Sequence, residues 1–476
     1  MQSFRNHRKG RIIAASILVL ATGLAPSLGA QAAPLSVKDA VTRALEKNLS
    51  VQSSSWDWLS ASANADAARW RMMPSLSLSA GYQRLSDLGA ESLQMANPFY
   101  PLGPSQIDFA FPASLSNYWA LAVNTQYQVF AGFRIREAAT LAQLQAESKL
   151  VGMEMVKRSL MFEVRRAYWE AVRATSNRQT LQKNLELMKS SSQLASQQFA
   201  QGIATKADLL AAAARYSQAD LDLGDAVARQ NRAYLTLASL IGNPSIGLSP
   251  SPQSADAPPP FTLTSQPGDP AESGFGQSLE ENDLVAEALS RRPETRMTSL
   301  SMEMAEHGIK QAQAGLYPTV TLTGNYTYAD PNQRVPFQTD PTIFTGTWAI
   351  GVQIGYDIGG VGTNLAAVKA QEQALKKTQA DGDKQRNTVT LDVRTCIISL
   401  EQARRDVALT QGAVDQATED VRVAQQRLAS GTANDLEVLT AQFNLLRANF
   451  SVTNREIDAQ IASADLARAT ALDEVK

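Results

Sequence analysis

The sequence predicts an α+β membrane protein made of two similar halves, each with two membrane-crossing strands followed by long coiled-coil helices. Three observations support this prediction: short segments in which apolar and polar residues alternate, long proline-free segments with heptad spacing, and the recurrence of both patterns in the same order. The chain has 476 residues, of which 44% are hydrophobic and 19% charged. This length exceeds a typical single domain, so a repeat or an elongated architecture is expected.

Residues 1–32 have the pattern of a secretory signal peptide. Four basic residues within 5–11 precede an apolar run at 12–28, and the small residues of 30–32 suit cleavage. An uncleaved anchor is the alternative, but glycine and proline interrupt the run. No lipobox cysteine stands directly after the signal, so no lipid anchor is expected. Removing four of the 44 basic residues leaves a net charge of −6 against 46 acidic residues, and nothing suggests nucleic-acid binding.

The two halves share three landmarks: a proline before an alternating segment, a glycine-containing turn before a long helix, and a glycine that interrupts a heptad pattern. These lie at Pro74 and Pro318, at 130–133 and 358–361, and at Gly202 and Gly431. The offset is 228 residues at the turns and 229 at the interrupting glycines. The sequence therefore predicts an internal duplication that is in register over most of its length.

These landmarks divide the mature chain into a first repeat at 33–242 and a second at 283–476. Each repeat is predicted to hold a helix, two strands and a pair of long helices. Between them, 243–282 is rich in proline, with eight of the chain's 20 prolines in and around it. We expect an exposed equatorial linker, and whether it contains a short strand or helix stays open.

Four segments, 75–82, 119–129, 319–328 and 348–356, alternate between an apolar face and an uncharged polar face. A half-buried soluble sheet would alternate in the same way. Segments of about 8 to 11 residues, however, can cross a bilayer when tilted. Aromatic residues near their ends suit the girdle of a membrane barrel. These are Tyr82, Trp119, Tyr127, Tyr326, Trp348 and Tyr356. The intervening segments, 85–117 and 329–346, are predicted to be external loops.

Four strands are too few to close a barrel, because the smallest membrane barrels have about eight. An open edge in lipid would leave backbone groups unpaired, at a cost of several kcal/mol each. Two or more copies of the chain must therefore share one barrel, and the alternation alone does not determine how many.

Long helices account for most of the remaining chain. Residues 134–199 contain no proline, and 407–428 and 436–457 keep the alternating three- and four-residue spacing of a coiled coil. At 1.5 Å per residue, the first of these helices would span about 100 Å. Many seam positions are Ala, Ser or Thr, so the helices can pack closely in a wall.

Two tight turns, at about 200–206 and 429–435, interrupt these helices. The glycines favour the end of one helix, and Thr205 and Asn434 are predicted N-caps of the next. Strands and turns alternate along the chain, so we expect the strands at one end of the molecule and the helix tips at the other.

In these features the chain resembles the TolC-like outer-membrane efflux protein family, the exit ducts of tripartite pumps and type I secretion systems. The resemblance covers the whole mature chain and includes the tip motifs Gly-x-x-x-x-x-Asp-Leu-Leu and Gly-Thr-x-x-x-x-Glu-Val-Leu. It implies a trimeric channel-tunnel, with a twelve-stranded barrel of four strands per chain that continues into a coiled-coil α-helical barrel. It also implies the outer membrane of a Gram-negative bacterium, contact with outer-membrane lipid, a periplasmic helical extension, and two partners, a periplasmic adaptor and an inner-membrane RND or ABC pump.

The resemblance places an acidic residue six positions after each tip glycine, and Asp208 and Glu437 stand there. Thr440 occupies the place of a second acidic ring, and Ala433 replaces a basic residue. We hypothesise that Glu437, Asp208 and Thr440 lie at the periplasmic aperture. The alternative is that both acids only suit the dipole at the start of a helix. The tip residues predicted to dock an adaptor are Gly202, Thr205, Lys206, Gly431, Thr432 and Asn434.

Residue types needed for catalysis are sparse. The mature chain has one histidine, His307, and the chain has one cysteine, Cys396, which we predict to be a buried thiol. No spacing suits a metal site, and the glycine-rich 355–362 lacks the pattern of a nucleotide loop. We expect neither an enzyme nor a cofactor.

The predicted function is therefore a passive duct for exporting small molecules or proteins. The competing interpretation is a periplasmic coiled-coil adaptor or scaffold, which would have one helical hairpin between soluble β domains. A nutrient porin is disfavoured because porins consist mostly of strands. Whether the cargo is a drug, a metal ion, a metabolite or a protein stays open.

Overall fold

The computed structural model describes residues 33–84, 86, 92–99, 101–110, 117–242, 261–266, 280–330 and 343–472. The predicted signal peptide at 1–32 lies outside this range. In chain order the elements are β1 (Ala33–Leu35), α1 (Val37–Lys47), α2 (Leu49–Trp70), β2 (Ser75–Arg84), β3 (Ser92–Ala96), β4 (Gln106–Ala110), β5 (Asn117–Ala131), α3 (Arg134–Ala200), α4 (Lys206–Leu240), β6 (Phe261–Leu263), α5 (Glu281–Arg291), α6 (Pro293–Gln313), η2 (Ala314–Leu316), β7 (Thr319–Asp330), β8 (Thr345–Gly355), α7 (Val361–Ala429) and α8 (Asp435–Thr470).

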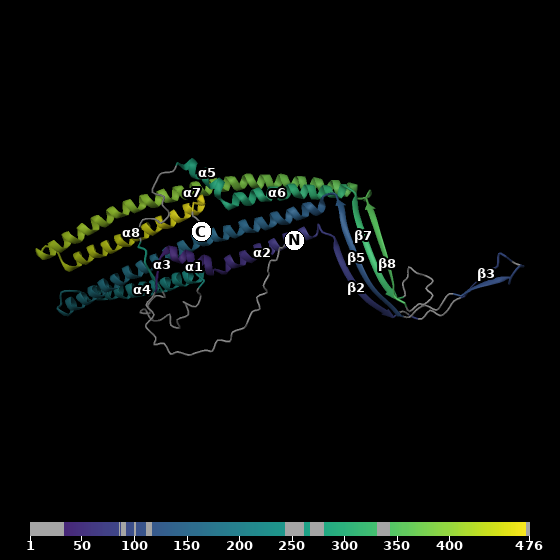
Figure 1. Ribbon diagram of the computed structural model, residues 1–476. Helices are drawn as coiled ribbons and strands as arrows, with labels where there is room; N and C mark the ends of the chain where they lie inside the picture. The colour runs from purple at the N-terminus through teal and green to yellow at the C-terminus, as the bar shows by residue number, and fades with distance from the viewer. Residues whose placement is uncertain are drawn as a thin grey trace, which may run out of the picture.

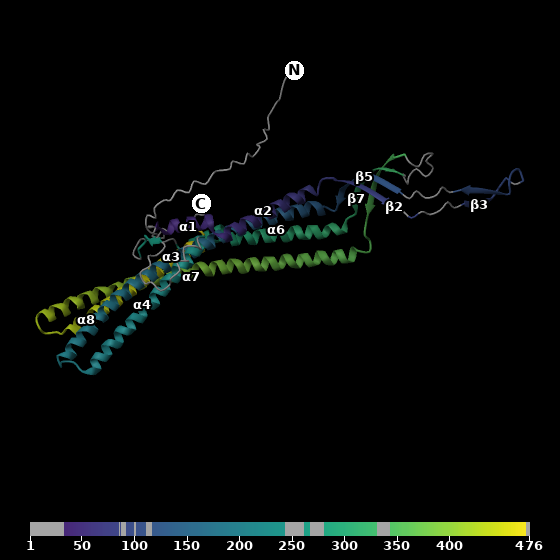
Figure 2. The ribbon, with the colours of Figure 1, turned by 90° about the horizontal axis from the view of Figure 1, so that it is seen from below.

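The molecule is elongated, with a β-sheet at one end and two helix tips at the other (Figures 1 and 2). This is the arrangement expected from the alternation of strands and tips along the sequence. None of the helices in the described ranges is both long and apolar enough to span a bilayer.

The sheet contains all four predicted strands, paired antiparallel in the order β2-β5-β7-β8. Its register places Tyr82 opposite Trp119 and Tyr326 opposite Trp348. A β-bulge lies between Gln128 and Phe130 in the pairing of β5 with β7. Simple alternation does not predict this irregularity, because a bulge adds one residue to one strand and shifts the facing of those that follow.

The segment at 85–117 contains more structure than the predicted loop. Its strands β3 and β4 pair with each other in a separate antiparallel ribbon. Figure 1 shows β3 projecting beyond the end of the main sheet. The ribbon pairs with no other described strand. The loop was predicted from the Pro, Asp and Asn residues of this segment, and strands of only five residues are too short to give a clear alternating pattern.

The helices form a layer that is four helices wide at each level. Near the sheet the neighbours are α2, α3, α6 and α7, and toward the tips they are α4, α3, α8 and α7. The longest helices, α3 and α7, contain 67 and 69 residues and run through both levels. At 1.5 Å per residue each spans about 100 Å, in agreement with the length predicted from the sequence.

Corresponding elements before and after the proline-rich segment have nearly equal lengths. The helix pairs α1 and α5 have 11 and 11 residues, α2 and α6 have 22 and 21, and α4 and α8 have 35 and 36. The order of helices and main-sheet strands is also the same on both sides.

The largest apolar core lies midway along the helices, where α1, α3 and α4 surround the short parallel pair β1 and β6. Tyr168 of α3 is fully buried there, and its hydroxyl donates to the carbonyl of Leu35 at 2.9 Å and accepts from the Ser265 N–H at 3.1 Å. The predicted linker at 243–282 therefore contains a short strand, β6, a point that the sequence did not decide. Helix α5 begins two residues before the predicted start of the second repeat.

A second core joins α5, α7 and α8 and contains an ionic network. The buried Arg292, at the junction of α5 and α6, pairs with Glu294 at 3.1 Å and Asp392 at 2.7 Å. Arg468 bridges Asp392 to Asp465. Burial alone would raise the pKa of the Glu294 carboxyl, but hydrogen bonding and charge from Arg292 outweigh it, and the pKa is lowered.

Cys396 lies in this second core and is 4% exposed, as predicted for a core thiol. Burial, together with the carboxylates of Asp465 and Asp392, raises the pKa of the thiol from its ordinary value of 9.0 to about 12. The reactive thiolate is therefore scarce at neutral pH.

We expect the folded protein to resist alkylation of Cys396 by iodoacetamide at pH 8, because the thiol is both protonated and covered. Mass spectrometry after timed labelling measures the modified fraction, and the same chain in guanidinium is the control that should label fully. Equally rapid labelling of the folded and denatured chains would contradict the buried position.

Candidate functional site

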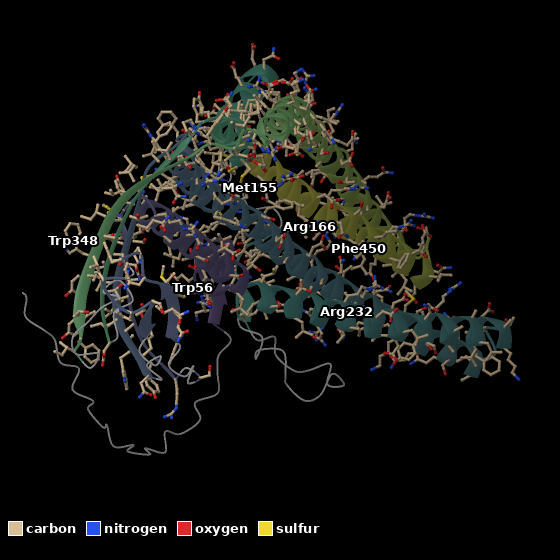
Figure 3. The ribbon with its side chains drawn as sticks, turned by 90° about the vertical axis from the view of Figure 1, so that its right-hand side faces the viewer. Trp56, Met155, Arg166, Arg232, Trp348 and Phe450 are labelled. Atoms are coloured by element: carbon tan, nitrogen blue, oxygen red, sulfur yellow. The ribbon has the colours of Figure 1, made fainter. Side chains whose placement is uncertain are left out.

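The apolar face of the main sheet is exposed. On β8, Trp348, Ile350, Val352 and Ile354 point to one side and are each between 65% and 72% exposed. Figure 3 shows Trp348 on the convex side of the curved sheet. An apolar surface of this extent over successive strands requires a covering, either lipid or protein.

The opposite face is polar and uncharged, as predicted. Asn325 of β7 donates its side-chain amide to the Asn124 side chain of β5 at 2.8 Å, and Ser77 lies opposite Asn124 on β2. Threonines continue the row, and the hydroxyl of Thr323 donates to the carbonyl of Gly351 at 3.3 Å. This face suits contact with water and presents no fixed charge.

The predicted girdle residues lie at several positions along the strands. Tyr82 and Trp119 lie opposite each other toward the end away from the helices, with their rings 4.4 Å apart. Tyr326 and Trp348 lie opposite each other at the level of Val123, midway between Trp119 and Tyr127 on β5. Tyr127 and Tyr356 lie at the helical end. Eight residues separate Trp119 from Tyr127, which is about 26 Å along a strand. The register therefore spreads the six residues along the strands, and their role as a girdle stays a prediction.

The sheet has two free edges. Strands β2 and β8 each pair on one side only among the described strands. An edge strand of this kind can accept a further strand on its open side.

The first tip connects α3 to α4. Gly202 adopts a φ of +75°, and Thr205 caps α4 by accepting from the N–H of Asp208 at 3.2 Å. The Asp208 carboxylate accepts from the Thr205 hydroxyl at 2.6 Å and from its N–H at 3.0 Å. These bonds lower the pKa of the Asp208 carboxyl. Lys206 is the exposed first residue of α4.

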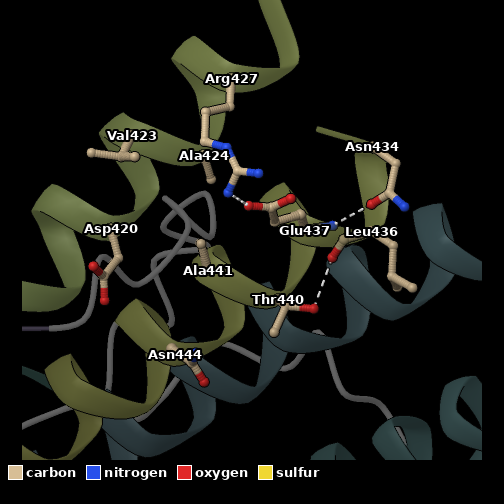
Figure 4. A pocket seen from close by; sticks show the side chains of 10 residues that line it. All are labelled: Asp420, Val423, Ala424, Arg427, Asn434, Leu436, Glu437, Thr440, Ala441 and Asn444. Atoms are coloured by element: carbon tan, nitrogen blue, oxygen red, sulfur yellow. Dashed lines mark hydrogen bonds and ion pairs between the residues drawn. The ribbon is translucent and has the colours of Figure 1, made fainter. Parts of the chain in front are cut away.

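The second tip connects α7 to α8 and differs in its ionic contacts. Gly431 adopts a φ of +74°, and Asn434 caps α8 by accepting from the Glu437 N–H at 3.0 Å. The Glu437 carboxylate instead turns back across the hairpin and forms an ion pair with Arg427, in the last turn of α7 (Figure 4). Thr432 donates its N–H to the Arg427 carbonyl at 2.9 Å, which closes the turn.

A groove of about 510 Å³ runs between α7 and α8 beside this ion pair. Arg427, Asn434, Glu437 and Thr440 line it near the turn, and Asp420 lines its far end (Figure 4). The Thr440 hydroxyl is used within its helix, since it donates to the Leu436 carbonyl at 2.8 Å. The groove is thus the place where three of the predicted tip residues meet.

The model of the outer membrane efflux protein family matches residues 40–243 and 284–472. The chain belongs to the outer membrane efflux protein family. It is 21% identical over 350 residues to the outer membrane efflux protein BepC of Brucella suis, covering 74% of this chain and 71% of BepC. It is 24% identical over 348 residues to the alkaline protease secretion protein AprF of Pseudomonas aeruginosa, covering 71% and 66% of the two chains.

The fold of this efflux protein matches that of the CmeC outer membrane channel of Campylobacter jejuni. The TM-score is 0.71 with 16% sequence identity, and the match covers 91% of this chain and 85% of CmeC. The predicted resemblance to TolC-like proteins is confirmed, and the single chain has a mostly helical fold with a sheet that is similar to that of these outer-membrane channel proteins.

Arg427 was missed by the sequence analysis. It stands four residues before the tip glycine, and Glu437 stands six after it, so the turn brings the two side chains face to face across the hairpin. The sequence feature that could have predicted this ion pair is the presence of opposite charges on either side of the predicted turn. In the first tip, the residue four before the glycine is the neutral Gln198, and the pattern is not repeated.

His307 has a structural contact, since its Nδ1 pairs with the Glu137 carboxylate and links α6 to α3. Among the residues with described positions, no cluster of His, Cys, Asp and Glu could hold a metal ion.

The two faces of β8 offer a direct test of which side meets lipid in this efflux protein. We expect Ile350→Arg to reduce folded protein in the outer-membrane fraction strongly, because an arginine at mid-bilayer costs about 2–4 kcal/mol. Gln353→Arg, three residues away on the polar face, is the matched control and should be tolerated. Urea unfolding in lipid vesicles measures both variants, and equal loss in the two would contradict the assignment of faces.

Proposed function

We propose that this protein is an outer-membrane exit duct that carries small molecules or proteins out of the periplasm or from an inner-membrane pump. It acts within a tripartite efflux or type I secretion complex and performs no catalysis itself. The observation that carries the proposal is a four-stranded sheet with an exposed apolar face, a neutral polar face and two free edges, set above about 100 Å of helices. The names of BepC and AprF refer to efflux and to protein secretion, and both cargo classes stay in the proposal.

Three copies of the chain supply the missing strands in this proposal. They form a twelve-stranded barrel that continues into a periplasmic helical barrel, without a lipid anchor. The sides of the helical layer support lateral contact between copies. On α2, Trp56 and Trp70 are 68% and 71% exposed at heptad-related spacing, and on α7 Leu391 and Ile398 are 67% and 64% exposed seven residues apart. Figure 3 shows Trp56 on the side of the layer opposite α7.

The repeats at 33–242 and 283–476 arose, in this proposal, by duplication. Under the offset of 228 residues, the buried Val172 corresponds to the buried Leu400. Under the offset of 229, the buried Leu237 corresponds to Leu466. The separate matches of the family model to 40–243 and 284–472 support the same division.

Purification tests the assembly. We expect the mature chain to require detergent for extraction from the outer membrane and to sediment as a trimer, because free strand edges and an apolar face cannot remain exposed. Mass photometry in detergent measures the number of copies. A water-soluble, monodisperse monomer without detergent would rule out the duct and favour a periplasmic scaffold.

At the other end of the duct, we propose that the tips form the periplasmic aperture and dock the adaptor. Glu437 lines the narrowest part in each copy, with Asp208 and Thr440 nearby and the turn residues around Gly202 and Gly431 exposed to the adaptor. A ring of carboxylates in a narrow pore raises the local concentration of cations. The Asp208 carboxylate is less available for this role, since Thr205 binds it.

Single-channel recording of the trimer in planar bilayers tests the aperture. We expect Glu437→Ala to reduce cation preference and block by divalent ions, because it removes one carboxylate per copy from the constriction. Glu401→Ala, an exposed acid of α7 farther from the tips, is the control. Unchanged selectivity and block in Glu437→Ala would place the constriction elsewhere.

A further inference from the structure

The acid of the second tip is already partnered within its own hairpin. The guanidinium of Arg427 pairs with the carboxylate of Glu437, and its second amino group lies 3.5 Å from the carbonyl of Thr432. Arginine thus contacts both the acid and the turn that precedes it. The pair joins the last turn of α7 to the first turn of α8 and lies along the groove of Figure 4.

The two tips use their acids differently because the side chains differ in length and surroundings. Asp208 is short, and Thr205 holds its carboxylate against the start of α4. Glu437 has one more methylene, and its N-cap residue Asn434 accepts only from the Glu437 backbone N–H. Its carboxylate is therefore free to reach Arg427, whereas the equivalent position in the first tip holds the neutral Gln198.

Both partners of the second-tip pair remain in contact with water. The side chains of Arg427 and Glu437 are 51% and 40% exposed. An ion pair with this exposure is weak and is screened by salt, so it can open without disrupting the hairpin. While the pair is closed, the cation cancels much of the field that the carboxylate would otherwise project into the pore.

We propose that Arg427 determines the ion selectivity of the duct by masking Glu437, so that the aperture carries strong negative charge only when this pair opens. This inference rests on the proposed position of Glu437 at the aperture. Its ligand class is the small cation, which competes with Arg427 for the carboxylate. The hairpin thus holds a charge that is hidden in the resting tip and becomes available when the tip rearranges.

The experiment is a double-mutant cycle in planar bilayers at 0.1 M salt, where charges act over about 10 Å. We expect Arg427→Gln to raise the cation-to-anion permeability ratio roughly two- to tenfold, since unmasked carboxylates concentrate cations. Glu437→Gln should lower the ratio. In the Glu437→Gln background, Arg427→Gln should raise the ratio by a much smaller factor, because no acid is left to unmask and only an unpaired positive charge is removed.

Two further variants separate masking from the simple loss of a positive charge. Arg427→Lys keeps the charge and should preserve the wild-type ratio. Arg422→Gln removes the same charge five residues away, from an exposed arginine paired with Glu419, and should leave the ratio unchanged. Thermal unfolding of each trimer checks assembly, and Arg427→Met, which keeps the aliphatic stem, replaces Arg427→Gln if that variant does not assemble.

The outcomes distinguish the mask from the aperture. If Glu437→Gln lowers the ratio but Arg427→Gln leaves it unchanged, the mask is wrong and the aperture stands. If Arg427→Gln raises the ratio by the same factor with and without Glu437, Arg427 acts as an independent charge and the mask is again wrong. If neither single variant changes the ratio, Glu437 does not line the aperture, and both proposals fail.

Discussion

The structure depends most on the two edges of its sheet. Strands β2 and β8 each have one neighbouring strand in the described sheet, and lipid cannot pair with backbone N–H and C=O groups. The apolar face adds a second requirement, because its large side chains need a nonpolar covering. In the proposed trimer, neighbouring copies supply the further strands and lipid supplies the nonpolar covering. The exposed apolar side chains on the sides of the helical layer extend the same requirement along the molecule.

Most of the fold could be predicted because its strands and helices have sequence patterns that repeat every two or seven residues. Alternation with a period of two located β2, β5, β7 and β8, and heptad spacing located the long helices. Glycines with positive φ and their capping residues located both tips, since those conformations depend on a few neighbouring residues.

The features that were not predicted depend on residues distant in sequence. Strands β1 and β6 have three residues each and are separated by more than two hundred, so neither carries a recognisable period. The bulge near Phe130 is visible only when β7 supplies the register. Within the site, capping by Thr205 and Asn434 was predictable because it is local. The pairing of Arg427 with Glu437 was not recognised, because it requires the turn to be built first.

Comparing the two halves shows how a nearly symmetric scaffold acquires different chemistry. At an offset of 228 residues, the buried Tyr168 of the first half corresponds to Cys396, and the buried Val164 corresponds to Asp392. This acid is partly exposed beside the second core, and Arg292 and Arg468 pair with it there. The first half instead completes its core with β1 and β6 around Tyr168.

The two tips, at the end of the helices away from the sheet, also keep equivalent positions but differ in their contacts. Each half places an acid six residues after its tip glycine, but a neighbouring threonine binds one and an arginine binds the other. Lengths and register are thus kept between the halves, where the helices must pack in one layer. Charges differ between them both beside the second core, at Asp392, and at the exposed tips. Function that depends on charge is therefore expected in the second half, whose acid is held by a weak, exposed partner instead of by its own helix cap.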